Sequence, residues 1–363
     1  MKKILTVVGT RPNFIKVTQF NKFLNQPEKG MIHKILHTGQ HYDEKMSTVF
    51  FDQFKLTPDY WLNIASGTPN TQMAKIMLGL EEIVNEYKPD LILVVGDVNS
   101  TFAAALTANK MGIKIGHIES GLRSCDRTMP EEFNRILADE ITNYFFVTEK
   151  SGYENLVKEG KPAENIYFVG NTMIDTLVAF EPQIQENKVL DEFGLLEKEF
   201  VLMTMHRPAT VDSEEGLLKL IEVIERITQE DKLVFPIHPR TLHHLNKMGL
   251  SARLEQNEKV ILVPPMDYFA FQKLIFASKY VITDSGGIQE ETTFRQIPCI
   301  TLRPNTERPS TVDVGTNTLA PFELEVIQGL IDAIKNGTYK KGEIPYLWDG
   351  NATQRIAEAI LSL

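Results

Sequence analysis

Short apolar runs alternate with longer amphipathic stretches along the chain. Runs typical of buried strands occupy residues 4–8, 34–37, 91–95, 115–118, 144–147, 200–204, 233–237, 260–263, 281–283 and 299–302. Helical patterns such as 214–227 and 267–277 separate them. A strand followed by an amphipathic helix is the repeating unit of a parallel sheet. The pattern therefore predicts an α/β protein with two Rossmann-like, doubly wound parallel-sheet domains.

The strand repeat pauses between residues 174 and 198, where a helical stretch leads into a charged one without a Gly/Ser-rich linker. We therefore expect an N-terminal domain over residues 1–170 and a C-terminal domain over residues 171–351. The last segment, 352–363, has the pattern of an amphipathic helix. We expect this helix to pack back on the first domain.

Length and charge narrow the functional classes. The 363 residues suggest about two domains. The net charge of −10 and the pI near 5.4 disfavour a nucleic-acid or anionic-membrane partner and leave room for a local basic pocket. Cys125 and Cys299 show no spacing that indicates a disulfide framework or a zinc site. The first apolar run is too short for a leader, and no run reaches the ~18 residues of a membrane span. We expect a cytoplasmic protein.

Three acidic residues stand at candidate element ends between residues 91 and 135. Asp97 follows one strand, Glu119 follows the next in a Gly-flanked turn with Arg123, and Glu131 follows Pro130 where a helix begins. Because ligands of doubly wound sheets bind beyond the carboxyl ends of the strands, we expect the three carboxylates to converge on one cavity suited to proton transfer. Helix capping is the simpler interpretation of Asp97, and a favourable dipole contact that of Glu131. No helix begins where Glu119 could cap it.

The usual phosphate-binding signatures are missing, since neither a GxxxxGK[ST] loop nor a GxGxxG turn follows the first strand. Instead, Ser285-Gly286-Gly287 links a strand to a helix, where backbone N–H groups can face a diphosphate. Ser285 as a simple N-cap is the alternative interpretation. The turn Gly9-Thr10-Arg11-Pro12 stands at the equivalent point of the first domain, and Arg11 and Lys16 add positive charge there. We expect the two turns to face each other across a cleft between the domains.

Several ordered motifs go beyond these local patterns. They are Gly9-Thr10-Arg11-Pro12, His37-Thr38-Gly39-Gln40-His41, Gly96-Asp97, His117-Ile118-Glu119-Ser120-Gly121-Leu122-Arg123, Met129-Pro130-Glu131-Glu132-Phe133-Asn134-Arg135, His206-Arg207, Asp284-Ser285-Gly286-Gly287-Ile288-Gln289-Glu290-Glu291 and Thr306-Glu307-Arg308-Pro309. With these motifs the chain resembles, over essentially its whole length, the non-hydrolysing UDP-N-acetylglucosamine 2-epimerases. The resemblance implies the two-Rossmann-domain GT-B fold and a UDP-sugar substrate.

The resemblance also implies a mechanism and roles for matched positions. UDP is eliminated to leave a 2-acetamidoglucal and then re-adds, with no NAD or metal cofactor. The catalytic positions implied are Asp97, Glu119, Glu131 and His206, the first three as acid/base groups and the histidine near the diphosphate. The substrate-binding positions implied are Arg11, Lys16, Arg123, Ser285, Gly286, Gly287, Glu291 and Arg308, of which Glu291 would accept ribose hydroxyls and Arg308 would contact phosphates. We expect a homodimer.

Three other functions fit parts of the sequence. A related epimerase acts on UDP-2,3-diacetamido-glucuronic acid, and Thr306-Glu307-Arg308-Pro309 favours the N-acetylglucosamine type. A GT-B glycosyltransferase would need an acceptor but not three carboxylates, and a non-catalytic sugar-nucleotide sensor would not need the carboxylates either.

The chain also departs from many relatives, with Asn13 in place of Glu and Arg207-Pro208-Ala209 in place of Arg-Glu-Asn. The second departure affects residues that form a regulatory UDP-GlcNAc site in some members, so allosteric activation is not expected.

Overall fold

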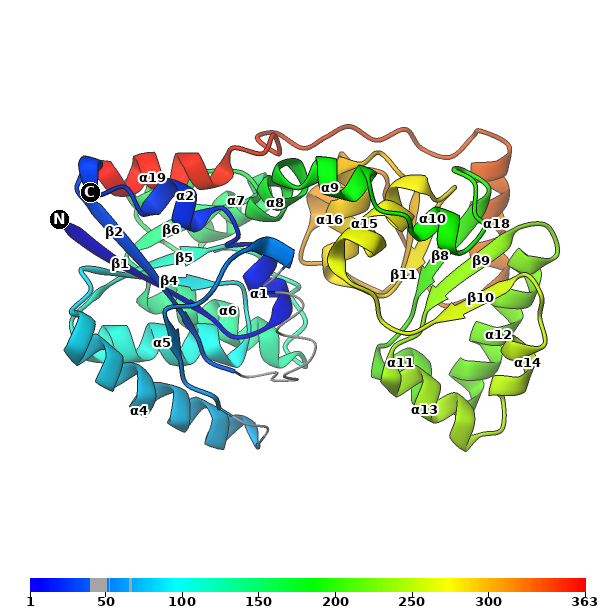
Figure 1. The fold of residues 1–363 in the computed structure, drawn as a ribbon, viewed down its shortest axis with the longest axis horizontal. Helices are drawn as coiled ribbons and strands as arrows, with labels where there is room; N and C mark the ends of the chain where they lie inside the picture. The colour runs from blue at the N-terminus through cyan, green and yellow to red at the C-terminus, as the bar shows by residue number, and fades with distance from the viewer. Residues whose placement is uncertain (40–50, 52, 65–66) are drawn as a thin grey trace. The chain divides into compact units, whose positions relative to one another are not determined.

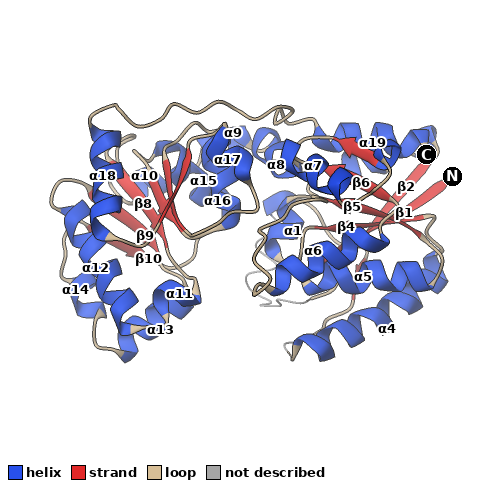
Figure 2. Ribbon diagram, turned by 180° about the vertical axis from the view of Figure 1, so that it is seen from behind, coloured by secondary structure: helices blue, strands red, loops and turns tan. Residues whose placement is uncertain are grey.

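The computed structural model describes residues 1–39, 51, 53–64 and 67–363. They form two compact units, residues 1–179 with 346–363 and residues 180–345. Each unit contains a parallel sheet with helices on both faces (Figure 1 and Figure 2). The predicted fold class of two doubly wound parallel-sheet domains is thus confirmed.

The sheet of the first unit has seven strands in the order β3-β2-β1-β4-β5-β6-β7. Its strands are β1 (Lys2–Val8), β2 (Met31–His37), β3 (Tyr60–Trp61), β4 (Leu91–Val95), β5 (Lys114–Ile118), β6 (Tyr144–Val147) and β7 (Ile166–Phe168). Its α-helices are α1 (Arg11–Ile15), α2 (Phe20–Leu24), α4 (Pro69–Tyr87), α5 (Asn99–Lys110), α6 (Pro130–Ile141), α7 (Lys150–Lys158), α8 (Thr172–Ala179) and α19 (Ala352–Ser362), with 3-10 turns η1 (Pro27–Lys29) and η2 (Ala163–Asn165). Helices α4, α5 and α6 cover one face (Figure 1).

The sheet of the second unit has six strands in the order β10-β9-β8-β11-β12-β13. Its strands are β8 (Phe200–Thr204), β9 (Lys232–Pro236), β10 (Val260–Val263), β11 (Val281–Thr283), β12 (Cys299–Leu302) and β13 (Asn317–Ala320). Its helices are α9 (Glu181–Gln185), α10 (Val189–Glu192), α11 (Pro208–Val211), α12 (Glu214–Thr228), α13 (Pro239–Lys247), α14 (Ser251–Glu255), α15 (Tyr268–Ala277), α16 (Gly286–Phe294), α17 (Pro309–Asp313) and α18 (Leu324–Lys335).

Strand β8 shows why the central strands are apolar throughout. Val201 and Met203 pack into the core on one face of the sheet, whereas Phe200 and Leu202 pack into the core on the other. Successive side chains of a strand point to opposite faces, so a strand covered by helices on both sides buries every residue. This continuous burial is the signal that made the central strands predictable.

Three strands were not predicted from the sequence: β3, β7 and β13. Each is an outermost strand of its sheet and therefore pairs on one side only. Each is short and keeps partly exposed residues, as in Tyr60 and Trp61 of β3. These three strands lack the continuous apolar run that marks a central strand, and this explains the omission. The edge strand β10 keeps such a run and was predicted.

The boundary between the units differs from the expected boundary at residues 170 and 171. Helix α8 lies in the first unit, because the Thr176 hydroxyl donates to the Ile15 carbonyl at 2.5 Å and Asp175 binds the start of α19. The Asp175 carboxylate accepts the N–H groups of Ala352 at 3.0 Å and Thr353 at 2.5 Å. Buried Trp348 donates to the Thr148 carbonyl at 3.0 Å. These contacts place the C-terminal segment in the first unit.

Candidate active site

Both sheets have a point where the strand order reverses direction, between β1 and β4 in the first unit and between β8 and β11 in the second. Ligands of doubly wound proteins bind beyond the strand carboxyl ends at such points. Asp97 follows β4 and His206 follows β8, so both lie at these ends. The candidate site is described separately in each unit.

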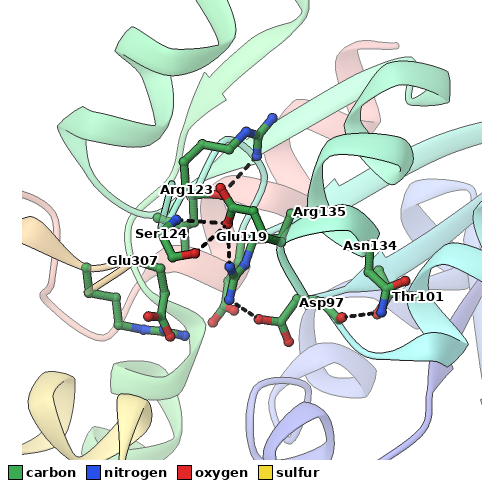
Figure 3. A network of polar contacts seen from close by, with 12 residues as sticks. Asp97, Thr101, Glu119, Arg123, Ser124, Asn134, Arg135 and Glu307 are labelled. Atoms are coloured by element: carbon green, nitrogen blue, oxygen red, sulfur yellow. Dashed lines mark hydrogen bonds and ion pairs between the residues drawn. The ribbon is translucent and has the colours of Figure 1, made fainter. Parts of the chain in front are cut away.

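In the first unit, Asp97 does not cap helix α5. The N-cap position is Val98, and no side chain caps the helix there. The Asp97 carboxylate instead forms an ion pair with Arg135 of α6, and the Asn134 amide donates to the Asp97 backbone carbonyl at 2.9 Å (Figure 3). About a quarter of the Asp97 side chain stays exposed (24%), so the carboxylate remains accessible to a ligand.

Glu119 lies in the turn after β5 and is buried, with a backbone φ of 68°. A left-handed backbone at a residue other than glycine costs free energy, and such strain clusters at functional sites. Its carboxylate accepts a hydrogen bond from Lys16 at 2.5 Å. A Cβ atom placed on Gly96 would lie 3.6 Å from the Glu119 carboxylate and 3.5 Å from the Lys16 ammonium. The backbone that carries Asp97 therefore passes beside the Glu119–Lys16 pair.

The pairing of Lys16 with Glu119 was not foreseen, since the sequence suggested a phosphate contact for Lys16. Asn13, the position where many relatives carry Glu, is also buried here. Its amide donates to the Val95 carbonyl at 3.1 Å and accepts the Thr10 hydroxyl at 3.0 Å. Asn13 thus joins the end of β4 to the turn that carries Arg11, which is half-buried at the start of α1.

Glu131 occupies the first turn of α6, directly after Pro130, and is half-buried. An acidic group there interacts favourably with the helix dipole, so the structural interpretation of Glu131 agrees with its position. Its neighbour Glu132 was not singled out from the sequence. Glu132 accepts the N–H groups of Ser124 and Cys125, each at 2.9 Å, and pairs with Arg135 at 2.9 Å. These bonds anchor the loop after Glu119 to α6.

Arg123 was expected to bind substrate, and the structure gives its guanidinium two carboxylate partners. Asp139 of α6 lies 2.8 Å away and Glu159 lies 2.7 Å away. Burial alone would lower the pKa of Arg123, but the two carboxylates raise it. In this arrangement the Arg123 charge is paired with two carboxylates, and the pairs connect the turn after β5 to α6 and to Glu159. The motif residues Gln40 and His41 lie outside the described residues.

In the second unit, His206 is held by Asp284, which is completely buried at the end of β11. The His206 Nδ1 atom lies 2.7 Å from the Asp284 carboxylate, which also accepts the backbone N–H groups of His206 at 2.8 Å and Arg207 at 2.7 Å. Burial alone would raise the pKa of Asp284, but the His206 hydrogen bond and these N–H groups lower it. With 39% of its side chain exposed, the His206 ring is oriented by a fixed anion while facing outward.

Helix α16 begins directly after Ser285, at the N-terminus where the sequence predicts a diphosphate site. Ser285 is its N-cap residue, but no side chain makes a capping hydrogen bond. A Cβ atom on Gly286 would lie 2.9 Å from the Glu307 carboxylate, so a side chain at this position would require Glu307 to shift. The Glu307 carboxylate pairs with Arg303 at 3.0 Å and with Arg308 at 2.6 Å. Gly286 thus rests against a buried ion-pair cluster.

Arg308 is buried beside Gly286 at the start of α16, and Glu291 is buried further along the same helix. Arg308 also pairs with Glu290 at 2.6 Å, so this guanidinium must exchange carboxylate contacts if it binds a phosphate. Burial raises the pKa of Glu291 to about 7. A carboxyl group of this kind can donate or accept hydrogen bonds near neutral pH.

Residues 1–39, 51, 53–64 and 67–363 contain neither a candidate metal site nor a candidate membrane-spanning helix. They contain no group of three or more His, Cys, Asp and Glu side chains placed to hold a metal ion. In the same residues, no helix is both long enough and apolar enough to cross a membrane.

Two Rossmann-ordered sheets, with buried carboxylates at one reversal point and a glycine turn at the other, define an α/β enzyme of the GT-B class. The profile of the family described as "UDP-N-acetylglucosamine 2-epimerase" matches residues 25–361. The chain belongs to this family and is an isomerase.

Individual relatives agree with this membership. A protein of Methanococcus maripaludis named UDP-N-acetylglucosamine 2-epimerase is 42% identical over 92% of this chain and 91% of its own length. A Pseudomonas aeruginosa protein named UDP-2,3-diacetamido-2,3-dideoxy-D-glucuronate 2-epimerase is 34% identical over 99% of this chain and 100% of its own. The crystal structure of Methanocaldococcus jannaschii UDP-GlcNAc 2-epimerase in complex with UDP-GlcNAc and UDP matches with a TM-score of 0.89 and 37% identity, covering 99% of this chain and 100% of that chain.

Proposed function

We propose that the protein interconverts UDP-GlcNAc and UDP-ManNAc without hydrolysing either. The observation that carries the proposal is the geometry beside β1, β4 and β5, where a buried Glu119 and its Lys16 partner lie next to the turn that presents Asp97. Epimerisation at C2 needs groups that remove and return a proton on two sides of the sugar ring. Carboxylates held by fixed cations in one unit suit that task.

The chemistry proceeds by elimination and re-addition. The hydrogen at C2 is not adjacent to a carbonyl, so it becomes acidic only when the anomeric C–O bond to UDP breaks and the ring oxygen stabilises the positive centre. A carboxylate then takes the C2 proton, leaving UDP and 2-acetamidoglucal. UDP re-adds at the anomeric carbon while a proton reaches the opposite face of C2. The assignment of Asp97, Glu119 and Glu131 as acid/base groups is part of this proposal.

The nucleotide is proposed to bind the second unit. The N-terminus of α16, where no side chain caps the helix, would bind the diphosphate through Ser285, Gly286 and Gly287. His206 faces outward from the end of β8 and would stabilise negative charge on the departing group. Glu291 would accept ribose hydroxyls and Arg308 would bind phosphate. Within the first unit, Arg11 is also proposed as a substrate-binding residue.

The cellular context is also proposed. A nucleotide sugar is a cytoplasmic metabolite, so we place the protein in the cytoplasm, working as a homodimer and independently of nucleic acids and membranes. A size measurement by sedimentation equilibrium tests the dimer.

The decisive experiment incubates the protein with UDP-GlcNAc in D₂O and follows the sugar by NMR. The expected result is an equilibrium mixture with UDP-ManNAc that carries deuterium at C2, because the proton passes through an exchangeable carboxylate. UDP-2,3-diacetamido-glucuronic acid serves as the competing substrate. Epimerisation with full retention of the C2 hydrogen would contradict the mechanism, and turnover of the glucuronic acid derivative alone would contradict the substrate.

A further inference from the structure

His117 is a completely buried residue of β5 for which the proposed reaction assigns no role. Both of its ring nitrogens lie at hydrogen-bond distance from acceptors. Nε2 is 2.8 Å from the Gly96 backbone carbonyl, and Nδ1 is 2.6 Å from the Asp139 carboxylate. A backbone carbonyl can only accept, so Nε2 carries a proton.

Whether the second ring nitrogen, Nδ1, donates or accepts a hydrogen bond depends on the Asp139 carboxylate that it faces. One Asp139 oxygen faces His117, while the other accepts the Gly121 N–H at 3.0 Å and pairs with Arg123 at 2.8 Å. Burial alone would raise the pKa of Asp139, but His117, Arg123 and the Gly121 N–H lower it overall. An ionised carboxylate accepts from Nδ1, so Nδ1 carries a proton as well.

We propose that His117 donates hydrogen bonds from both ring nitrogens, and that His117 and Asp139 are positioning residues that fasten the Asp97 and Glu119 turns to helix α6. The charged groups that face His117 are Asp139 and, behind it, Arg123 and Glu159. The neighbouring strands place Val94 and Phe145 opposite His117, and neither residue titrates.

The contacts explain how one helix orders both turns. Through His117, α6 holds the Gly96 carbonyl, which directly precedes Asp97. Through Asp139, it holds the Gly121 N–H, two residues after Glu119. Hydrogen bonds to an ionised carboxylate are shorter and stronger than neutral ones, so the Asp139 contact holds the His117 ring firmly against the Gly96 carbonyl. Small displacements of a reacting group cost large factors in rate, and this gives the two residues their effect on catalysis.

The first test reads the two donor positions directly and needs no substrate. The protein is labelled with ¹⁵N-histidine, and the His117 signals are assigned by their loss in His117→Gln. Both ring nitrogens are expected to carry a hydrogen, because each one faces an acceptor. A spectrum in which one of the two nitrogens carries no hydrogen would overturn the double-donor assignment.

The second test reads positioning, and its kinetic part rests on the proposed function. Asp139→Asn keeps the size of the side chain but leaves His117 without an anion and Arg123 with Glu159 as its carboxylate partner. We expect kcat to fall roughly 10- to 100-fold while KM changes less than about 3-fold. The amide hydrogens of Gly96 and Gly121 are expected to exchange faster. Glu159→Gln, which alters only the outer partner of Arg123, is the control and should change kcat by less than about 2-fold.

The outcomes separate this inference from the proposed function. If the wild-type protein does not epimerise UDP-GlcNAc, the proposed function fails, and the histidine spectra and amide exchange still decide the inference. If Asp139→Asn does not fold, His117→Gln replaces it, since a glutamine amide can donate to the Gly96 carbonyl without carrying charge. Unchanged exchange at Gly96 together with unchanged kcat in the folded variant would overturn the positioning role.

Discussion

The two units share one strand order but carry different chemistry at the point where that order reverses. In the first unit the strand ends present carboxylates, and fixed cations pair with them, as in Glu119 with Lys16 and Asp97 with Arg135. In the second unit a glycine turn leads into the nine-residue helix α16, and arginine–glutamate pairs lie behind it. Under the proposed function, one fold provides a place for proton transfer and a place for an anion, and the residues after the strands decide which.

The difference extends to how each key side chain is held. Glu119 is buried and strained, with 2% of its side chain exposed, whereas His206 is anchored at one ring nitrogen and remains 39% exposed. A group that transfers protons benefits from a fixed position in a low-dielectric site. A group that meets a departing diphosphate must remain accessible. The following predictions test this division of labour.

The largest expected effect lies in the first unit. Asp97→Asn, Glu119→Gln and Glu131→Gln keep side-chain size and remove proton transfer, so each should lower kcat by ~10²–10⁴-fold. Thermal unfolding checks that each variant folds. Glu154→Gln alters an exposed carboxylate of α7 and serves as the control. Near-normal turnover in all three variants would contradict the acid/base assignment. The three carboxylates would then have structural roles alone, such as the contact of Glu131 with the helix dipole.

A smaller effect is expected for nucleotide binding in the second unit. Arg308→Ala removes a cation, and Glu291→Ala removes a hydroxyl acceptor, so each should weaken UDP binding by roughly 1.5–3 kcal/mol. Titration calorimetry with UDP measures the change. Arg253→Ala, which removes a surface partner of Glu225, is the matched control. Unchanged UDP affinity in both Arg308→Ala and Glu291→Ala would contradict a nucleotide-binding site beside α16.

The sequence was informative about central strands because burial on both faces leaves a continuous apolar run, as in β8. It was also informative about which residues end those strands. It could not show which charges pair, because Lys16 and Glu119 are far apart in the chain and neither local pattern refers to the other. For the same reason the sequence did not indicate that Asp139 and Glu159 pair with Arg123. Pairing of charges depends on tertiary geometry.

Glu291 provides a test of burial in the second unit. Its pKa is raised to about 7 from 4.5 by burial, so its contribution to stability is complete below pH 4.5 and is lost as pH rises through 7. Glu291→Gln should therefore stabilise the fold at pH 8 by about 1–3 kcal/mol and have little effect at pH 4. Urea unfolding at both pH values measures the difference. Glu192→Gln, at an exposed position of α10, should show no such pH dependence.

The smallest expected effect concerns regulation and follows from Arg207-Pro208-Ala209. Some relatives carry Arg-Glu-Asn there and bind a second UDP-GlcNAc beside the active site. Proline has neither a side-chain acceptor nor a backbone N–H, and alanine has no polar side-chain group, so neither replaces the charge-assisted bonds of a carboxylate. Coupling requires a ligand that prefers one conformation, and losing those contacts removes much of that preference.

We therefore expect hyperbolic kinetics for UDP-GlcNAc and conversion of pure UDP-ManNAc without a UDP-GlcNAc primer. Initial rates across substrate concentration, in both directions, measure this. The double variant Pro208→Glu/Ala209→Asn tests the cause, because it restores the residues found in those relatives and should introduce curvature if they suffice. A sigmoidal wild-type curve, with UDP-ManNAc inert until a trace of UDP-GlcNAc is added, would show that other residues supply the regulatory contacts.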